Sequence, residues 1–203
     1  MKQREMDRLM QHFDRYFEQS DCLIIHPIVD DGYHIDVLFY KPTEKYPFWK
    51  LVTMGASDYR MPRVSNTISR YNEYMMFVDK EEDLNNNDLV MWYRDKLVTI
   101  ATYACYNRIH ITYGHSLEWK NYDADDEMVA AFIEFPQVVE NIEMLRCKLG
   151  MFKVAACLQT ILLNRDDLKL LRKIGPYAFS EYLYPNDGGK RHFLSERHRS
   201  DKF

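Results

Sequence analysis

The segment Gly55-Ala56-Ser57-Asp58 offers a candidate nucleophile, because Ser57 follows an apolar run typical of a strand. A nucleophile elbow also needs a glycine two residues after the serine, and Tyr59 occupies that position. Two interpretations remain. One is a small serine hydrolase that uses Ser57, His115 and an aspartate. The other, which we favour, is a glycine turn in which the serine and aspartate hydrogen-bond nearby amides.

Two histidines are candidates for metal ligation. His110 and His115 are five residues apart and flank Gly114, whereas zinc ligands on one strand prefer a spacing of two. Glu118 and the acidic loop that follows could supply oxygen ligands, but no third ligand has a matching spacing. We therefore expect hydrogen-bonded histidines at a turn and no metal site.

The acidic loop contains Asp123, Asp125 and Asp126. It lacks the spacing and the central glycine of a calcium-binding EF-hand loop. We expect a solvated loop that contacts a basic partner protein.

The low glycine content excludes several cofactor sites. Only seven of 203 residues are glycine, and only Gly188 and Gly189 are neighbours. Dinucleotide-binding and Walker A loops need clustered glycines, so no cofactor is expected. The formal net charge of −4 also makes nucleic acid an unexpected partner, and the basic tail, residues 186–203, is expected to fray in solvent.

The elements that must position these residues follow from hydrophobic periodicity. The pattern predicts one α+β domain over residues 1–203, with a mixed, largely antiparallel sheet and helices packed against it. Helices are expected over residues 1–20, 89–106 (capped by Asp88), 152–163 and 167–173, with a stop at Gly175-Pro176. Strands are expected over 35–40, 48–55, 74–78, 109–113, 129–135 and 142–149, and an Asp-Gly turn before the first of these indicates a hairpin.

Cellular location is also constrained by the sequence. The charged N-terminal segment has no signal-peptide core, and no apolar run is long enough to cross a membrane. The four cysteines, Cys22, Cys105, Cys147 and Cys157, form no CxxC pair. We expect a cytoplasmic protein with reduced thiols in apolar surroundings.

The abundance of aromatic residues is the main sign of an interaction surface. The chain has 15 Tyr, 11 Phe and 3 Trp, and tyrosine, tryptophan and arginine are enriched at protein interfaces. Most of the aromatics are expected to fill the core. Tyr59 and Tyr71 flank a long polar connection, so we predict partner contacts at Asp58, Tyr59, Arg60 and Tyr71.

Two segments resemble the suppressor of fused-like domain family. The run YPFWKLVTMGASDYRM, residues 46–61, is similar to the signature segment of that family, and ITYGHSLEW, residues 111–119, to its later Gly-His block. The residues that carry the likeness are Gly55, Ser57, Asp58, Gly114 and His115. The order of elements extends the resemblance over residues 23–173, although the acidic residue expected shortly before the last helix is not evident.

The resemblance implies a non-enzymatic protein-binding domain without a cofactor or catalytic residues. Animal members carry a large second domain, for which 203 residues leave no room, so the chain looks more like bacterial single-domain members that act as immunity proteins against a toxin. The alternatives are the serine hydrolase considered above and a structural or regulatory domain without a toxin partner.

Overall fold

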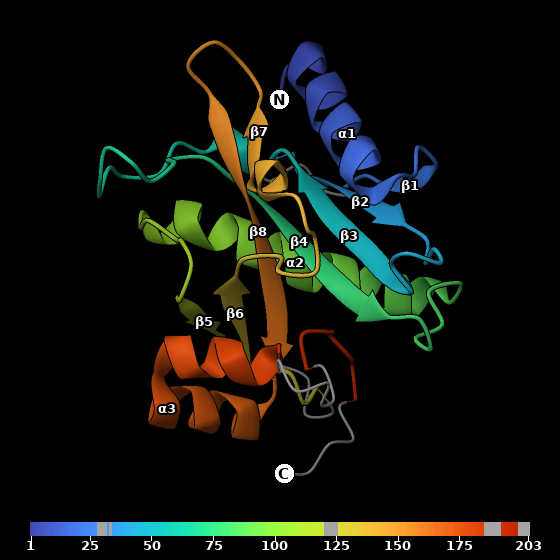
Figure 1. Ribbon diagram of the computed structural model, residues 1–203, viewed down its shortest axis with the longest axis vertical. Coiled ribbons are helices and arrows are strands. Elements are labelled where there is room, and N and C mark those ends of the chain that lie inside the picture. Colours follow the sequence, from blue (N-terminus) through green and yellow to red (C-terminus); the bar gives the residue numbers. More distant parts are fainter. Residues whose placement is uncertain (28–31, 33, 120–125, 185–191, 199–203) are drawn as a thin grey trace.

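An open, mixed sheet forms the centre of the molecule (Figure 1). The structure, a computed structural model, describes residues 1–27, 32, 34–119, 126–184 and 192–198. In chain order its elements are α1 (Gln3–Phe17), β1 (Cys22–Ile25), β2 (Asp36–Tyr40), β3 (Phe48–Met54), the 3₁₀ helix η1 (Ala56–Asp58), β4 (Asn72–Asp79), α2 (Asn87–Asn107), β5 (Ser116–Glu118), β6 (Ala130–Glu134), the 3₁₀ helix η2 (Ile142–Leu145), β7 (Arg146–Lys148), β8 (Val154–Leu163) and α3 (Arg165–Leu183).

The strands follow the order β1-β2-β3-β4-β8-β6-β5, and β7 also pairs with β8. Only β4 and β8 run parallel; the other pairs of named strands in the described residues are antiparallel. The predicted class, α+β with a mixed, largely antiparallel sheet, is therefore confirmed. The expected strands at 35–40, 48–55, 74–78 and 129–135 lie within two residues of β2, β3, β4 and β6.

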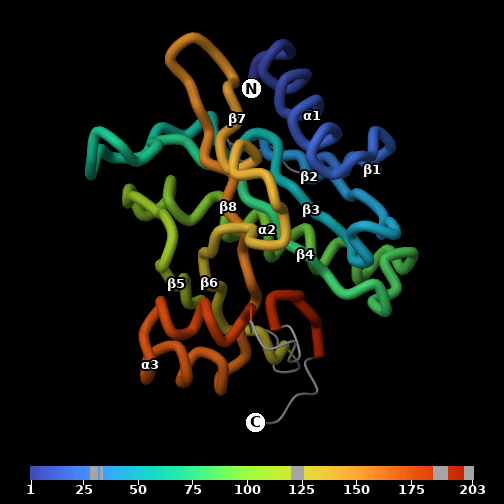
Figure 2. The backbone as a smooth tube through the Cα atoms, viewed as in Figure 1, coloured from blue at the N-terminus to red at the C-terminus, as the bar shows by residue number. Residues whose placement is uncertain are grey.

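Helices cover both faces of the sheet. Successive side chains of a strand point to opposite faces, and in β2 Leu38 and Tyr40 face one core while Val37 and Phe39 face the other. The first core includes the buried residues of α1 and α3, and the second those of α2. Figure 2 shows α2 crossing behind the sheet while α1 lies in front of it.

The segment expected to form a helix over residues 152–163 is instead β8, so that prediction is wrong. From Cys157 onward the side chains of β8 are buried on both faces. A strand that is buried on both sides has no period-two pattern, and its apolar run resembles that of a buried helix. The parallel pairing with β4, which only the fold reveals, makes β8 a central strand.

Two further predicted strands are corrected. Residues 109–113 form no strand, because the chain turns between Thr112 and His115 and the strand β5 begins only at Ser116. Residues 142–149 form η2 followed by β7. In η2, the side chain of Asn141 accepts a hydrogen bond from the amide of Glu143 at 2.9 Å and caps the helical turn.

The ends of the helices also differ in detail from prediction. The cap of α2 is Asn86 rather than Asp88, since the Asn86 side chain accepts from the Asp88 amide at 2.9 Å. Gly175 interrupts α3 with a φ of 82°, and a second helical segment begins at Pro176. Within the described part of the chain, no helix combines the length and apolar character that a membrane span requires.

Part of the basic tail packs against the sheet instead of fraying. Phe193 is only 2% exposed, and the amide of Ser195 donates to the carbonyl oxygen of Phe77 at 2.7 Å. This contact extends the hydrogen bonding of β4. Residues 186–191 and 199–203 of the expected tail lie outside the described residues.

The four cysteines are free thiols, as expected. Cys147 and Cys157 are buried, and burial raises the pKa of both, that of Cys147 to about 12. These two thiols are therefore protonated near neutral pH and unreactive.

Candidate functional site

The turn after β3 has a backbone geometry that requires glycine. Gly55 has a φ of 127°, and a Cβ atom placed there would lie 2.3 Å from the carbonyl oxygen of His34. Any side chain at this position would displace the backbone that enters β2. Gly55 therefore has a structural role.

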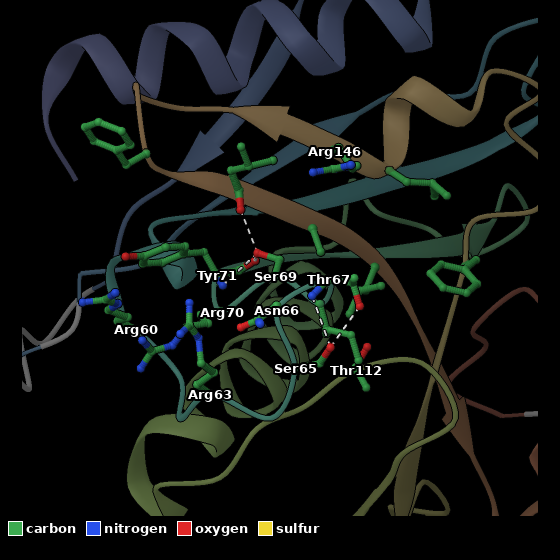
Figure 3. Close-up of a pocket in the computed structure, with 17 residues that line it drawn as sticks. Arg60, Arg63, Ser65, Asn66, Thr67, Ser69, Arg70, Tyr71, Thr112 and Arg146 are labelled. Carbon is green, nitrogen blue, oxygen red and sulfur yellow. Dashed lines mark hydrogen bonds between the residues drawn. The ribbon is translucent and has the colours of Figure 1, made fainter.

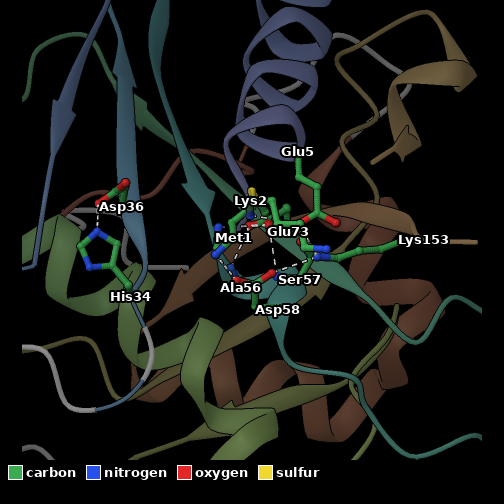
Figure 4. A network of polar contacts seen from close by, with 11 residues as sticks. Met1, Lys2, Glu5, His34, Asp36, Ala56, Ser57, Asp58, Glu73 and Lys153 are labelled. Atoms are coloured by element: carbon green, nitrogen blue, oxygen red, sulfur yellow. Dashed lines mark hydrogen bonds and ion pairs between the residues drawn. The ribbon is translucent and has the colours of Figure 1, made fainter. Parts of the chain in front are cut away.

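The carboxylate of Glu73 on β4 holds this turn in place (Figure 4). Glu73 is fully buried. It accepts hydrogen bonds from the hydroxyl of Thr53 at 2.7 Å and from the amides of Gly55, Ala56 and Ser57 at 3.2, 3.3 and 3.1 Å. Three successive amides that point at one carboxylate form an anion-binding nest, here filled by a side chain of the same molecule.

Burial raises the pKa of Glu73, although the hydrogen bonds from Thr53 and Ser57 act in the opposite direction. Perturbed carboxyl groups often mark active sites. Here, however, both oxygens already accept hydrogen bonds and no part of the side chain reaches solvent. Glu73 is therefore a structural acid with no access for a substrate.

Asp58 joins the same turn to two distant segments. Its Oδ1 accepts from Nζ of Lys153 at 2.9 Å, and its Oδ2 pairs with the amino group of Met1. Burial opposes ionisation of Asp58, but these two cationic partners outweigh it and lower the pKa of the carboxyl group. Lys153 also pairs with Glu5 of α1 at 3.3 Å, so this cluster fastens α1 to η1 and to the start of β8.

Ser57 and His115 are not brought together. Ser57 is fully buried after β3, whereas His115 precedes β5, four positions away in the strand order. Neighbouring strands lie about 4.8 Å apart, so roughly 19 Å of sheet separates the two residues. Nδ1 of His115 instead lies 2.9 Å from the carbonyl oxygen of Thr112. This geometry supports no serine–histidine pair, and nothing in the described residues favours the hydrolase.

The second motif, Gly114-His115, forms a turn that leads into β5. Gly114 has a φ of 84°, and its amide donates to the carbonyl oxygen of Ile133 on β6 at 2.9 Å. The amide of Ile133 in turn donates to the carbonyl oxygen of His115 at 2.9 Å. Both segments that carry the family resemblance thus shape turns at strand ends.

His110 also has a structural contact. It is 9% exposed, and its Nδ1 lies 3.0 Å from the carbonyl oxygen of Pro62 in the connection before β4. Among the described residues, the only group of three potential metal ligands is His26, His34 and Asp36. It contains neither His110 nor His115.

A pocket of about 470 Å³ lies along the connection between η1 and β4, residues 59–71 (Figure 3). The connection contains no helix or strand, as expected. Met61 and Arg70 close it into a loop through two hydrogen bonds, of 2.9 and 2.7 Å. The hydroxyl of Ser69 donates to the carbonyl oxygen of Val154 at 2.7 Å and ties the loop to β8. We call this cavity the arginine pocket.

Four arginines line the arginine pocket: Arg60, Arg63, Arg70 and Arg146. Figure 3 shows Arg60, Arg63 and Arg70 gathered along the connection and Arg146 across the pocket on the strand above. No carboxylate in the described part of the chain lies within ion-pair distance of any of them. Because the chain as a whole has a net charge of −4, this pocket is a local concentration of positive charge.

Apolar side chains complete the lining. Ile68 and Phe135 are 39% and 40% exposed, and Phe152 is 91% exposed. Tyr71 also lines the pocket and is half-buried, with Nζ of Lys153 5.9 Å from its ring centroid. Exposed aromatic and aliphatic groups beside arginines are the composition that marks interface centres.

A second groove, about 1110 Å³ in volume, runs beside α1 and shares Arg146 with the arginine pocket. Arg4, Arg8 and Arg15 line it, together with the acidic residues Glu5 and Glu143. Nη1 of Arg8 already donates to the carbonyl oxygen of Leu149 at 2.6 Å. The positive surface thus continues from the pocket towards α1, but there it is partly neutralised.

The predicted contact residues Asp58, Tyr59, Arg60 and Tyr71 fall into three environments. Arg60 and Tyr71 line the arginine pocket. Asp58 lies beside it, because its partner Lys153 also faces the Tyr71 ring. Tyr59 packs against the core on the α2 side and is only half exposed.

The acidic loop gives a different result. The side chain of Asp126 is 8% exposed and pairs with Lys96, whose Nζ lies 5.2 Å from the ring centroids of Trp92 and Trp119. Its carboxylate is therefore committed to an internal cation instead of lying free in a solvated loop. Asp123 and Asp125 lie outside the described residues.

Sequence reasoning missed Arg63, Arg70 and Arg146. The first two share a thirteen-residue connection with Arg60, and their repetition along RMPRVSNTISR was a visible signal of positive charge. Arg146 had no such signal. It joins the pocket only because β7 pairs with β8.

Comparison with known proteins identifies relatives of this fold. The family model described as "Suppressor of fused protein (SUFU)" matches residues 31–188. Among the curated proteins, a search found no match.

Solved structures resemble the chain at low sequence identity. A crystal structure of a Sufu–Fu complex matches with a TM-score of 0.65 and 14% identity, over 97% of this chain and 91% of that one. A suppressor of fused homologue from Neisseria gonorrhoeae FA 1090 gives a TM-score of 0.65 and 10% identity, over 97% and 95%. Drosophila Suppressor of Fused gives 0.65 and 14%, over 95% of this chain but 50% of that protein, so the chain spans half its length.

Proposed function

The chain belongs to the suppressor of fused protein family, and from this membership we propose that it is a non-enzymatic protein that binds a partner protein through the arginine pocket. The observation that carries the proposal is the set of four arginines that line one pocket without a carboxylate partner in the described residues. A relative that was crystallised as a Sufu–Fu complex supports protein binding as the activity.

The chemistry of the pocket defines the kind of segment that would bind. Guanidinium groups bind carboxylates through paired, charge-assisted hydrogen bonds. Ile68, Phe135 and Phe152 offer apolar contact beside them. The expected ligand is an acidic protein segment with one or two large apolar side chains that cover these exposed groups.

The proposed mechanism is occlusion. A partner surface that lies on the arginine pocket would be shielded from its own substrates or targets. In its finer form, the proposal is that the partner is a toxin and that the protein is an immunity-type inhibitor in the cytoplasm. The predicted contacts at Asp58 and Tyr59 and the acidic residues Asp123 and Asp125 remain proposals for the rim of such an interface.

The test is a comparison of captured partners. The wild type and the double variant Arg63→Glu/Arg146→Glu are immobilised and exposed to lysate of the native host, and the retained proteins are identified by mass spectrometry. Lys169→Glu is the matched control, because Lys169 is 76% exposed on α3 and lies outside the pocket. Circular dichroism checks that all three proteins are folded.

We expect one protein to be retained by the wild type and by Lys169→Glu and to be lost from the double variant. A partner retained equally by all three would overturn the pocket as the binding site. No specific partner on the wild type would overturn the protein-binding function. For the toxin role, expression of the identified partner should arrest growth, and co-expression of this protein should restore it.

A further inference from the structure

A second cluster of chemically active side chains lies where the chain leaves β1 and enters β2, at the connected end of the β1–β2 hairpin. The strand register pairs Cys22 with Tyr40 and Ile25 with Val37, so His26 stands opposite Asp36. His34 lies just before β2, and its Nε2 approaches the same carboxylate. The connected end of the hairpin thus brings two imidazoles and one carboxylate together.

The ligand atoms of the cluster lie at hydrogen-bond distance, slightly closer together than the ligands of a metal ion. Nδ1 of His26 and Nε2 of His34 lie 2.8 and 3.0 Å from the same oxygen, Oδ1 of Asp36, and Figure 4 shows the His34 contact. All three potential ligand atoms lie within 4.8 Å of one another. Ligands of a tetrahedral zinc ion, at about 2.0–2.2 Å from the metal, are roughly 3.4 Å apart. Small rotations of the two imidazoles would therefore suffice to place an ion between the three groups.

The exposure of the three side chains fits a site that is anchored below and open above. The Asp36 side chain is 2% exposed, whereas those of His26 and His34 are 65% and 54% exposed. A buried carboxylate positions one ligand rigidly, and the exposed imidazoles can adjust. With three protein ligands, the fourth position faces solvent and can take water or a side chain of another molecule.

We propose that His26, His34 and Asp36 form a binding site for a zinc-like divalent cation. Two imidazole nitrogens and one carboxylate oxygen suit Zn²⁺, Co²⁺ and Ni²⁺ rather than Mg²⁺ or Ca²⁺, which prefer all-oxygen ligands. The site does not depend on the proposed partner function, because none of its residues lines the arginine pocket.

The test measures metal binding directly. Metal-free wild-type protein is equilibrated by dialysis against micromolar Zn²⁺, and the bound metal is counted by elemental mass spectrometry. His26→Ala and His34→Ala remove one ligand each. Both residues are largely exposed, so these variants should stay folded. His198→Ala is the matched control, because His198 is also exposed, at 66%, and lies outside the cluster.

We expect one zinc per chain in the wild type and in His198→Ala, and at least a tenfold loss of affinity in each ligand variant. Co²⁺ should give the intense visible bands of a four-coordinate ion in the wild type only. Bound zinc that is unchanged in His26→Ala and His34→Ala would overturn the site. No zinc bound by the wild type would also overturn it and would leave the two histidines as hydrogen-bond donors to Asp36. A higher affinity for Mg²⁺ than for Zn²⁺ would overturn the metal class.

Discussion

Two regions that follow one another in the chain differ in whether their charged groups have partners within the molecule. At the turn 55–58, the buried carboxylate of Glu73 on β4 accepts hydrogen bonds from the backbone of the turn and from Thr53. In the connection 59–71, the guanidinium groups of the exposed Arg60 and Arg63 and of the part-buried Arg70 have no carboxylate partner in the described part of the chain. The carboxylate at the turn is therefore fully hydrogen-bonded within the fold, whereas the guanidinium groups of the arginine pocket are available to bind an anion of another molecule.

The difference separates residues that identify the family from residues that could carry its activity. Gly55, Ser57 and Asp58 carry the resemblance in the sequence, and all three are committed to holding β2, β3, β4 and α1 together. Of the arginines next to them, Arg70 donates to the carbonyl oxygen of Met61, whereas Arg60 and Arg63 are exposed. Buried and exposed substitutions should therefore give separable effects on stability and on binding.

The largest expected effect is on the turn. Gly55→Ala should lower the free energy of unfolding by about 3–5 kcal/mol, because it adds a Cβ against the His34 carbonyl at a positive φ. Gly32→Ala is the matched control, since Gly32 has a φ of 98° but nothing within 4 Å of an added Cβ. It should lose only about 1–2 kcal/mol. Equal losses in urea denaturation would show that the close contact at Gly55 is unimportant.

A smaller effect is expected at the carboxylate. Glu73→Gln should lower stability by about 1–3 kcal/mol, because its amide group turns a donor towards backbone amides that need an acceptor. Asp58→Asn changes a partly exposed carboxylate in the same turn and should cost less than about 1 kcal/mol. Equal losses in the two variants, measured by urea denaturation, would contradict the contrast between the buried and exposed acids.

The arginine pocket should respond in binding and not in stability. Once the partner is identified, Arg63→Glu/Arg146→Glu should weaken its affinity by roughly tenfold to a hundredfold, the equivalent of one or two lost charged hydrogen bonds. Isothermal titration calorimetry measures the affinity, and the unfolding free energy should stay within about 0.5 kcal/mol of the wild type. A stability loss as large as that of Glu73→Gln would mean that these arginines support the fold.

The smallest effect is a pH dependence that arises from Glu73. Burial raises the pKa of this carboxyl group above its ordinary 4.5, so between the two pKa values the folded state binds more protons than the unfolded state. Stability from this group therefore falls as the pH rises through that interval. Glu73→Gln has no such proton, so the difference in unfolding free energy between the two proteins should shrink from pH 5 to pH 8. A difference that grows over this range would show that the pKa of Glu73 is lowered by folding and would contradict the prediction.

Local signals in the sequence were sufficient for much of the fold. The helical stripe of α1 and the apolar runs of β2, β3, β4 and β6 lie where the sequence predicts them. These elements carry their own period, so no knowledge of their neighbours is needed. Gly55 and Gly114 also marked turns, because glycine readily adopts the positive φ that such turns require.

The sequence by itself determined the fold class, the family and the connection that bears Arg60 and Tyr71, because these depend on residues close together in the chain. Only the tertiary structure decided that β8 is a central strand, that Asp126 faces Lys96 and that Arg146 joins the connection. The features that the sequence did not reveal depend on residues that are far apart in the chain. A strand buried on both faces has no period of its own, and Arg146 lies 86 residues from Arg60. Positions that far apart meet only when the packing of the sheet brings them together.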